Sequence, residues 1–148
     1  MGNKLLVALN DSLSSRVVLD YLADLALCPD DLQLVLLHVF RKPSGGEELM
    51  GKKYMEQQPA RYMAILEESK KQLVEKGIFG DNIEIILVTE PYPTIAEGII
   101  DQANKLKPTM VIIGRKRMSK AEEFVLGDVS IKLVRALEGI AVLVVKMR

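Results

Sequence analysis

Two short segments of this sequence combine residue types that could bind a ligand. The first is Asn10-Asp11-Ser12-Leu13-Ser14-Ser15, which follows a short apolar run and is therefore expected to leave the end of a strand. Small polar side chains at such a place can cap the next helix. They can also face a ligand from a loop. The two interpretations are compatible if Ser14 or Ser15 caps the helix while Asn10 faces the ligand.

The second segment extends from Gly114 to Ser130. Gly114 comes directly after an apolar run, and a glycine there lets a ligand approach the backbone closely. Gly127 precedes a predicted helix whose free amide groups could bind an anion. Many helices begin after a glycine, so the spacing alone also fits an ordinary helix cap.

Other kinds of chemistry have few candidate residues. The chain has one histidine, His38, and one cysteine, Cys28. This argues against a multi-histidine metal centre, a Cys-His catalytic pair and an internal disulfide framework. His38 lies in an apolar segment with no catalytic partner nearby in sequence, so we expect a structural, hydrogen-bonded histidine. We therefore expect no catalytic site and no metal site.

The elements that must position these segments alternate along the chain. Apolar runs predict strands, and apolar residues at helical spacing predict helices between them. Val17, Val18, Tyr21, Leu22 and Leu25 are expected to face inward from the first helix, and Val129, Leu133, Val134 and Leu137 from the last. The expected strands are 4–9, 32–40, 82–88, 110–113 and 140–145, and the expected helices are 14–27, 60–76, 94–107 and 127–138.

The segments between these elements contain most of the helix-breaking residues. Residues 41–59 contain Pro43, Pro59 and three glycines, which predicts a long mobile loop with at most a helical turn near Glu47. Pro91 and Pro93 are expected to bracket a turn, and Thr94 to cap the helix that follows it. Gly77 and Gly139 are expected to end helices.

This alternation predicts an α/β fold in one domain, 1–148, with a doubly wound, five-stranded parallel sheet and helices on both faces. Ligands of such folds bind beyond the carboxyl ends of the strands, where the winding reverses. Glu84 interrupts the third strand, so this strand is expected at a sheet edge.

Composition narrows the class of partner. Twenty basic residues balance twenty acidic ones, so no net charge attracts nucleic acid or an anionic membrane. The basic run from Arg115 to Lys120 has no aromatic residue and precedes Glu122-Glu123, which favours a solvated loop. The longest apolar run, Ile140 to Val145, is too short to span a membrane. We expect a cytoplasmic protein.

The sequence resembles the universal stress protein family over essentially its whole length. Leu5 to Ser12 is similar to the family's first strand and its Val-Asp-Gly-Ser turn, and Leu36-Leu37-His38-Val39 is similar to its second strand. Segments 110–114 and 142–145 are similar to its fourth and last strands. The resemblance implies an adenine nucleotide alpha hydrolase-like fold with strand order 3-2-1-4-5. It also implies a nucleotide site at Leu9, Asn10, Val39, Gly114, Arg117, Gly127, Asp128 and Ser130.

Three of these positions depart from the family's nucleotide-binding residues. Two of them lie in its glycine pattern, which is Gly, two residues, Gly, nine residues, Gly, then Ser or Thr, and the third follows the first strand. The family's acidic residue near the ribose is replaced by Asn10, whose amide imitates a carboxylate only in part. The second glycine is replaced by Arg117, which could close the pocket or bind phosphate itself. The Ser or Thr is replaced by Asp128.

A carboxylate at Asp128 has two opposite effects. It stabilises the start of the helix by about 0.3–1 kcal/mol. It also repels a phosphate by roughly 4 kcal/mol at about 4 Å and an effective dielectric constant near 20, which is about three decades of affinity. We therefore expect weakened or lost ATP binding. Arg117 could pair with Asp128 in place of a phosphate, and tight binding would require Arg117 or Mg²⁺ to neutralise that carboxylate.

The resemblance implies a stress-response or regulatory protein rather than an enzyme, requiring no cofactor and acting through an unknown protein partner. It also implies a homodimer formed through the terminal strand, 140–145. This strand is very apolar, so we expect an exposed sheet edge there unless another subunit covers it. The alternative is an ATP- or AMP-binding sensor or slow ATPase, with Mg²⁺. A phosphoacceptor domain fits poorly because the third strand ends in Val88-Thr89-Glu90, and nothing specifies a flavin carrier.

Overall fold

A computed structural model describes residues 3–10, 13–24, 32–41, 45–115 and 129–146. Its five strands form one parallel sheet in the order β3-β2-β1-β4-β5, which confirms the predicted fold and strand order. The strands are β1 (Asn3–Ala8), β2 (Leu32–Arg41), β3 (Ile83–Tyr92), β4 (Met110–Arg115) and β5 (Ala141–Lys146).

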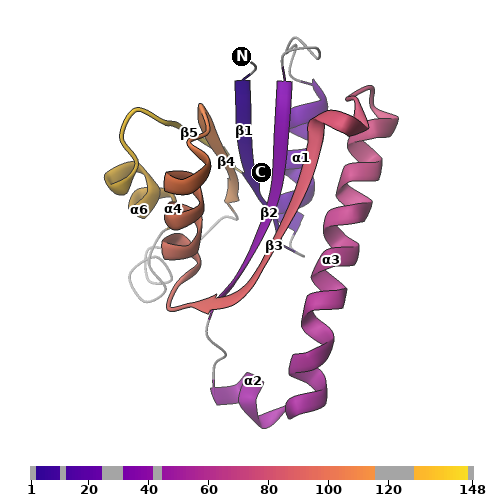
Figure 1. Cartoon of the computed structure of the whole chain (residues 1–148), viewed down its shortest axis with the longest axis vertical. Helices are drawn as coiled ribbons and strands as arrows, with labels where there is room; N and C mark the ends of the chain where they lie inside the picture. The colour runs from indigo at the N-terminus through magenta and orange to yellow at the C-terminus, as the bar shows by residue number, and fades with distance from the viewer. Residues whose placement is uncertain (1–2, 11–12, 25–31, 42–44, 116–128, 147–148) are drawn as a thin grey trace.

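Helices cover both faces of the sheet, as Figure 1 shows. One face carries α1 (Leu13–Asp24) and α3 (Lys52–Glu75), and the other carries α4 (Ile95–Leu106) and α6 (Val129–Ala136). Successive strand residues point to opposite faces, so Leu5 and Val7 pack toward α1 and α3 while Leu6 packs toward α4 and α6. The central strands are therefore apolar on both sides, as expected for a covered parallel sheet.

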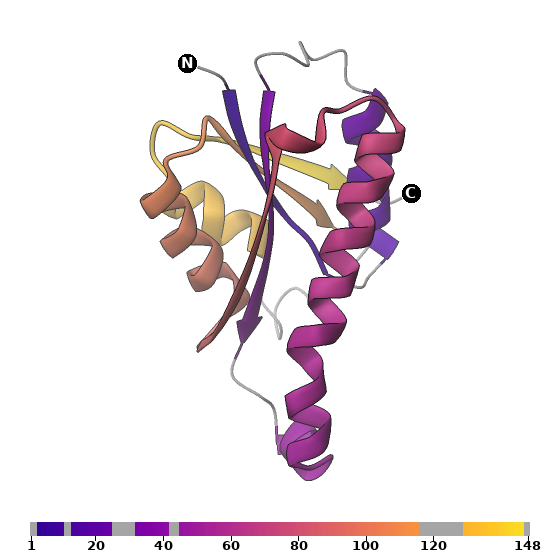
Figure 2. The ribbon, with the colours of Figure 1, turned by 45° about the vertical axis from the view of Figure 1, so that its right-hand side comes forward.

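The expectation of a long loop over residues 41–59 is wrong in most of its length. A short helix, α2 (Gly45–Leu49), precedes α3, and α3 begins at Lys52, with Pro59 inside it. Residues 52–58 are mostly good helix formers, and their summed preference outweighs the cost of one proline. Figure 2 shows that α2 and the first part of α3 extend beyond the carboxyl end of β2.

Several local predictions are confirmed. The hydroxyl of Thr94 accepts a hydrogen bond from the backbone amide of Glu97 at 3.2 Å and so caps α4. Gly77 and Gly139 follow helices with φ of 103° and 70°, a left-handed conformation that glycine adopts without a Cβ clash. β3 is an edge strand and runs through Pro91 to Tyr92, further than predicted, because an edge strand tolerates a proline.

Two residues that were expected to face inward are exposed. Tyr21 of α1 is 41% exposed and Val134 of α6 is 62% exposed. Both helices lie over the β5 side of the sheet, where α1 contacts β4 and β5 and α6 contacts β5. The sheet ends there, so part of each helix's apolar stripe lies beyond it. Leu25 is outside the described residues.

Candidate functional site

A small cavity lies at the carboxyl ends of β1 and β4, beside the turn that follows β1. Its volume is about 130 Å³. Four predicted site residues line it: Leu9, Asn10, Val39 and Gly114. Ser130 is buried at the start of α6, next to Val129, which also lines the cavity. The structure therefore brings residues from β1, β2, β4 and α6 together at the edge that the doubly wound fold predicts.

The remaining predicted site residues, Arg117, Gly127 and Asp128, are outside the described residues. The predicted pairing of Arg117 with Asp128 therefore stays a prediction. The same holds for the repulsion between Asp128 and a phosphate.

The turn after β1 is closed by two hydrogen bonds between Asn10 and Ser15. The backbone amide of Asn10 donates to the Ser15 hydroxyl at 2.9 Å, and that hydroxyl donates to the Asn10 side-chain oxygen at 3.0 Å. Ser15 is buried. The carboxamide that replaces the family's acidic residue is thus held by the helix start, with its oxygen already accepting one hydrogen bond.

His38 fixes the same turn from β2. The ring atom Nδ1 lies 2.7 Å from the carbonyl oxygen of Leu9, and the amide of Leu9 donates to the carbonyl of Leu37 at 2.8 Å. A carbonyl can only accept, so Nδ1 is the donor. The hydrogen bond expected of His38 is therefore confirmed, and its side chain is buried.

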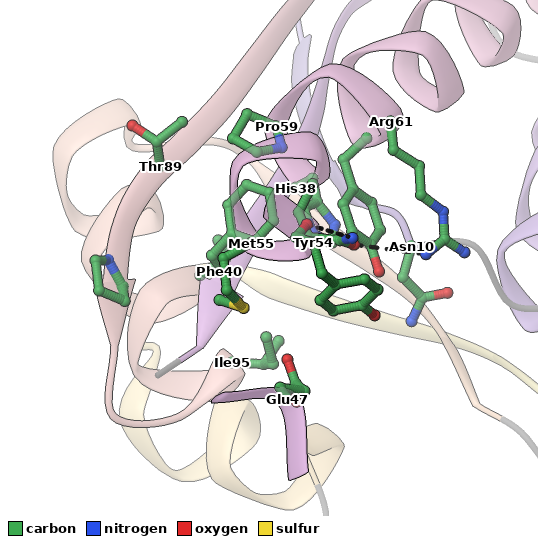
Figure 3. A pocket seen from close by; sticks show the side chains of 14 residues that line it. Asn10, His38, Phe40, Glu47, Tyr54, Met55, Pro59, Arg61, Thr89 and Ile95 are labelled. Carbon is green, nitrogen blue, oxygen red and sulfur yellow. Dashed lines mark hydrogen bonds between the residues drawn. The ribbon is translucent and has the colours of Figure 1, made fainter. Parts of the chain in front are cut away.

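A second and larger cavity adjoins the first (Figure 3). Its volume is about 580 Å³. Asn10, His38, Val39 and Ile95 line both cavities. The larger one lies between the ends of β2 and β3, the start of α4, and the segment of α2 and α3 that overhangs the sheet; its other lining residues are Phe40, Glu47, Tyr54, Met55, Gln58, Pro59, Arg61, Tyr62, Thr89 and Pro91.

Three rings form one wall of the larger cavity. His38 stacks on Tyr62 with ring centroids 3.8 Å apart and an interplanar angle of 8°. Phe40 meets both rings edge-on, at 4.9 Å from His38 and 5.3 Å from Tyr62. Such contacts stabilise beyond the area they bury. The guanidinium carbon of Arg61 lies 5.5 Å from the centre of the Tyr62 ring.

The sequence interpretation missed the residues that α3 contributes to this cavity. Tyr54, Met55, Gln58, Pro59 and Tyr62 recur at helical spacing. They continue the stripe that Leu66, Ser69 and Leu73 bury against the sheet. The periodicity was present in the sequence, but the proline and glycine content of residues 41–59 outweighed it.

A polar group lies outside both cavities, at the end of β3. The Tyr92 hydroxyl donates to Asp101 Oδ2, and Lys105 Nζ lies 3.0 Å from the same oxygen. The hydrogen bond from Tyr92 and then that from Lys105 lower the pKa of Asp101. The hydrogen bond to Asp101 raises the pKa of Tyr92 and likewise that of Lys105.

The described ranges lack two further features. They contain no cluster of three or more His, Cys, Asp or Glu side chains able to hold a metal ion. They also contain no helix that is both long and apolar enough to cross a bilayer.

Comparison with known proteins identifies a family over almost the whole chain. A model of the universal stress protein family matches residues 1–146. No match was found among curated proteins.

Solved structures with the same fold include universal stress proteins with bound ligands. One, in complex with cAMP, has a TM-score of 0.68 and 18% identity, with 97% of this chain and 95% of that chain covered. A family protein from Arabidopsis thaliana with AMP bound has a TM-score of 0.68 and 18% identity, covering 99% and 92%. A universal stress protein from Archaeoglobus fulgidus has a TM-score of 0.66 and 17% identity, covering 99% and 100%.

Proposed function

The chain belongs to the universal stress protein family, and from this premise we propose that it is a non-enzymatic regulatory protein of the stress response. It acts as a homodimer that binds a protein partner, and it binds adenine nucleotide only weakly. Residues 1–148 work as one domain in the cytoplasm. The observation that carries the proposal is the edge strand β5 and the groove beside it.

β5 has the properties of an association surface. It is an edge strand, and Val142, Leu143 and Val144 are only partly buried there. A groove of about 640 Å³ runs between β5 and α1. Its apolar lining residues are Val17, Tyr21, Leu143, Val144 and Val145, and its charged ones are Asp20, Asp24 and Lys146. An apolar edge strand is a template for pairing with another chain. A second copy joined along β5 would cover both the edge and the groove.

A charge placed in the groove tests the dimer. Tyr21→Lys changes a side chain that is 41% exposed, so the monomer should still fold. The added charge would lie in the dimer interface, and we expect the variant to elute as a monomer in size-exclusion chromatography with light scattering. Phe79→Lys is the matched control, because Phe79 is 59% exposed just before the opposite edge strand. A wild-type protein that stays monomeric at high concentration would contradict the proposal.

Weak nucleotide binding is supported by the turn after β1. Asn10 supplies an amide where the family has an acid, and its oxygen already accepts a hydrogen bond from Ser15. The repulsion expected from Asp128 acts in the same direction.

A second candidate function is a nucleotide sensor or slow ATPase that binds ATP or AMP with Mg²⁺. It is favoured by the assembly of Leu9, Asn10, Val39 and Gly114 around one cavity. The AMP and cAMP complexes of proteins with this fold also favour it.

A titration with labelled ATP, with and without Mg²⁺, separates the two functions. The weakly binding regulatory protein predicts dissociation constants above the micromolar range. The reason is that about 4 kcal/mol of repulsion between Asp128 and a phosphate removes about three decades of affinity. Asp128→Ser, which restores the family's residue type, should then tighten binding. Submicromolar binding by the wild type would favour the sensor instead.

A further inference from the structure

The strand β3 leaves one edge of the sheet open, and the proposed homodimer does not use this edge. Among the described strands, β3 is hydrogen-bonded to β2 alone, at the edge opposite β5 (Figure 1). We propose that β3 binds an extended, basic segment of a protein partner, which pairs with it as an added strand. This proposal rests on the proposed function and deepens it, because it assigns the surface that binds the partner and the chemistry of that partner.

The edge of β3 contains a stretch that is suited to pairing. Residues 85–89 (Ile-Ile-Leu-Val-Thr) contain no charge and no proline, two features that commonly protect an edge strand. Residues 36–39 of β2, which pair with residues 85–88, are buried, whereas residues 85–88 themselves are only partly buried. The apolar side chains of β3 therefore remain accessible from the open side of the sheet.

This stretch offers a binding surface on both faces of the sheet. Ile85 and Leu87 pack on the side of α1 and α3, and Ile86 and Val88 pack on the side of α4 and α6. A strand added beside β3 would place alternate side chains next to these two pairs. In strand addition, main-chain hydrogen bonds supply the affinity and the contacts of alternate side chains supply the specificity.

Carboxylates at both ends of the stretch indicate a basic partner. Glu84 and Glu90 are exposed on either side of residues 85–89, and Asp81 is exposed just before β3. Opposite charges on neighbouring strands stabilise their pairing. A partner strand with a basic residue at each end meets both carboxylates in a parallel or an antiparallel orientation. Lys105 of α4 interacts electrostatically with Glu90, so we expect Glu84 to contribute more.

The same carboxylates oppose pairing of β3 with a second copy of the chain. A symmetric antiparallel pair that uses all of residues 85–89 is centred on Leu87, and it places Glu84 of one copy opposite Glu90 of the other. Like charges directly opposite each other destabilise a sheet. Residues 141–146 of β5 contain no carboxylate. The two edges therefore suit different partners, a second copy at β5 and a basic segment at β3.

A short peptide tests the edge directly. The probe is a fluorescently labelled heptapeptide in which valine and threonine alternate between two terminal lysines. We expect saturable binding to the full chain in fluorescence anisotropy. We also expect the backbone amide resonances of residues 85–88 to shift, while those of residues 142–145 stay unchanged. The matched control is the same peptide N-methylated at every internal residue, which removes the amide donors and should weaken binding at least tenfold.

Glu84→Lys tests the electrostatic part of the proposal. Glu84 is exposed, so the variant should fold, and we expect the affinity for the unmodified peptide to fall by about two- to tenfold. Glu56→Lys makes the same change of net charge in the overhanging part of α3, at a side chain that is 64% exposed, and should leave the affinity unchanged. Three results would each overturn the proposal: equal affinity in the two variants, equal binding of the N-methylated peptide, or no saturable binding by the wild type.

The oligomeric state separates this proposal from the proposed function. Tyr21→Lys, which should disrupt the dimer at β5, should bind the peptide as tightly as the wild type does. Dissociation of the dimer by the peptide would place the peptide at β5, and a wild-type oligomer larger than a dimer would place a second copy at β3; either result overturns the proposal. A monomeric wild type that binds the peptide at residues 85–88 would remove the homodimer and support the site at β3.

Discussion

Two helices on opposite faces of the sheet, α3 and α4, use their length differently. α4 has 12 residues and packs closely against Val39 and Tyr92 through Gly98 in its first turn. α3 has 24 residues, and only its second half has buried side chains. The first half overhangs the strand ends and borders the larger cavity. Close packing on one face stabilises the fold, whereas the overhang on the other face creates space for a ligand.

Leu66→Ala should have the largest effect on stability. Leu66 is fully buried in the packed half of α3, and truncating such a leucine removes apolar contacts and leaves a cavity. We expect the free energy of unfolding to fall by about 2–5 kcal/mol, measured by urea denaturation. Leu49→Ala is the same substitution in the overhanging segment, at a side chain that is 89% exposed, and should change it by less than about 0.5 kcal/mol. Equal losses would mean that the overhanging segment is packed as closely as the second half of α3.

Gly98→Ala should have a smaller but clear effect on the α4 face. A Cβ at Gly98 would lie 2.1 Å from Val39 Cγ1 and 2.9 Å from Tyr92 Cδ2, so α4 must move away from the sheet. Overpacking of this kind costs about 1–3 kcal/mol, against about 1 kcal/mol gained because alanine favours a helix. A net loss in thermal or urea unfolding is expected. Gly45→Ala, with nothing within 4 Å, should show no loss, and a stabilised Gly98→Ala would refute close packing here.

The smallest expected effect on stability comes from Asp101 on the surface of α4, and it depends on pH. Hydrogen bonds from Tyr92 and Lys105 lower the pKa of Asp101 in the folded state. Asp101 therefore contributes stability that is complete above its ordinary pKa of 3.8 and is lost as the pH falls through the lowered value. Asp101→Asn should remove this part of the acid dependence in urea unfolding followed across that range.

Asp24→Asn, at the exposed end of α1, is the control for removing one carboxylate. It should leave the acid dependence attributed to Asp101 in place. An Asp101→Asn variant with the wild-type pH profile would show that the group at the end of β3 makes no contribution.

The sheet could be predicted from the sequence because its strands are short apolar runs separated by clear helix signals. Thr94, Gly77 and Gly139 marked helix ends correctly, since each acts through local backbone chemistry. Tyr21 and Val134 were placed wrongly because helical periodicity does not show where a sheet ends.

The candidate site was predicted only in part. Asn10 and Gly114 were singled out because each follows a strand, and a parallel sheet brings its strand ends to one edge. Leu9 and Val39 came from the family resemblance, and all four line one cavity. The larger cavity was missed because Pro59 suggested a loop where neighbouring helix formers prevail. The packing of Tyr62 on His38 joins residues far apart in sequence, and no local pattern indicates such a contact.

Native mass spectrometry of protein purified without added nucleotide tests the central claim most directly, because it reports the oligomer and any bound small molecule together. We predict the mass of a dimer with no adenine nucleotide retained. The mass of a monomer carrying ATP would contradict both the dimer and the weakened nucleotide site.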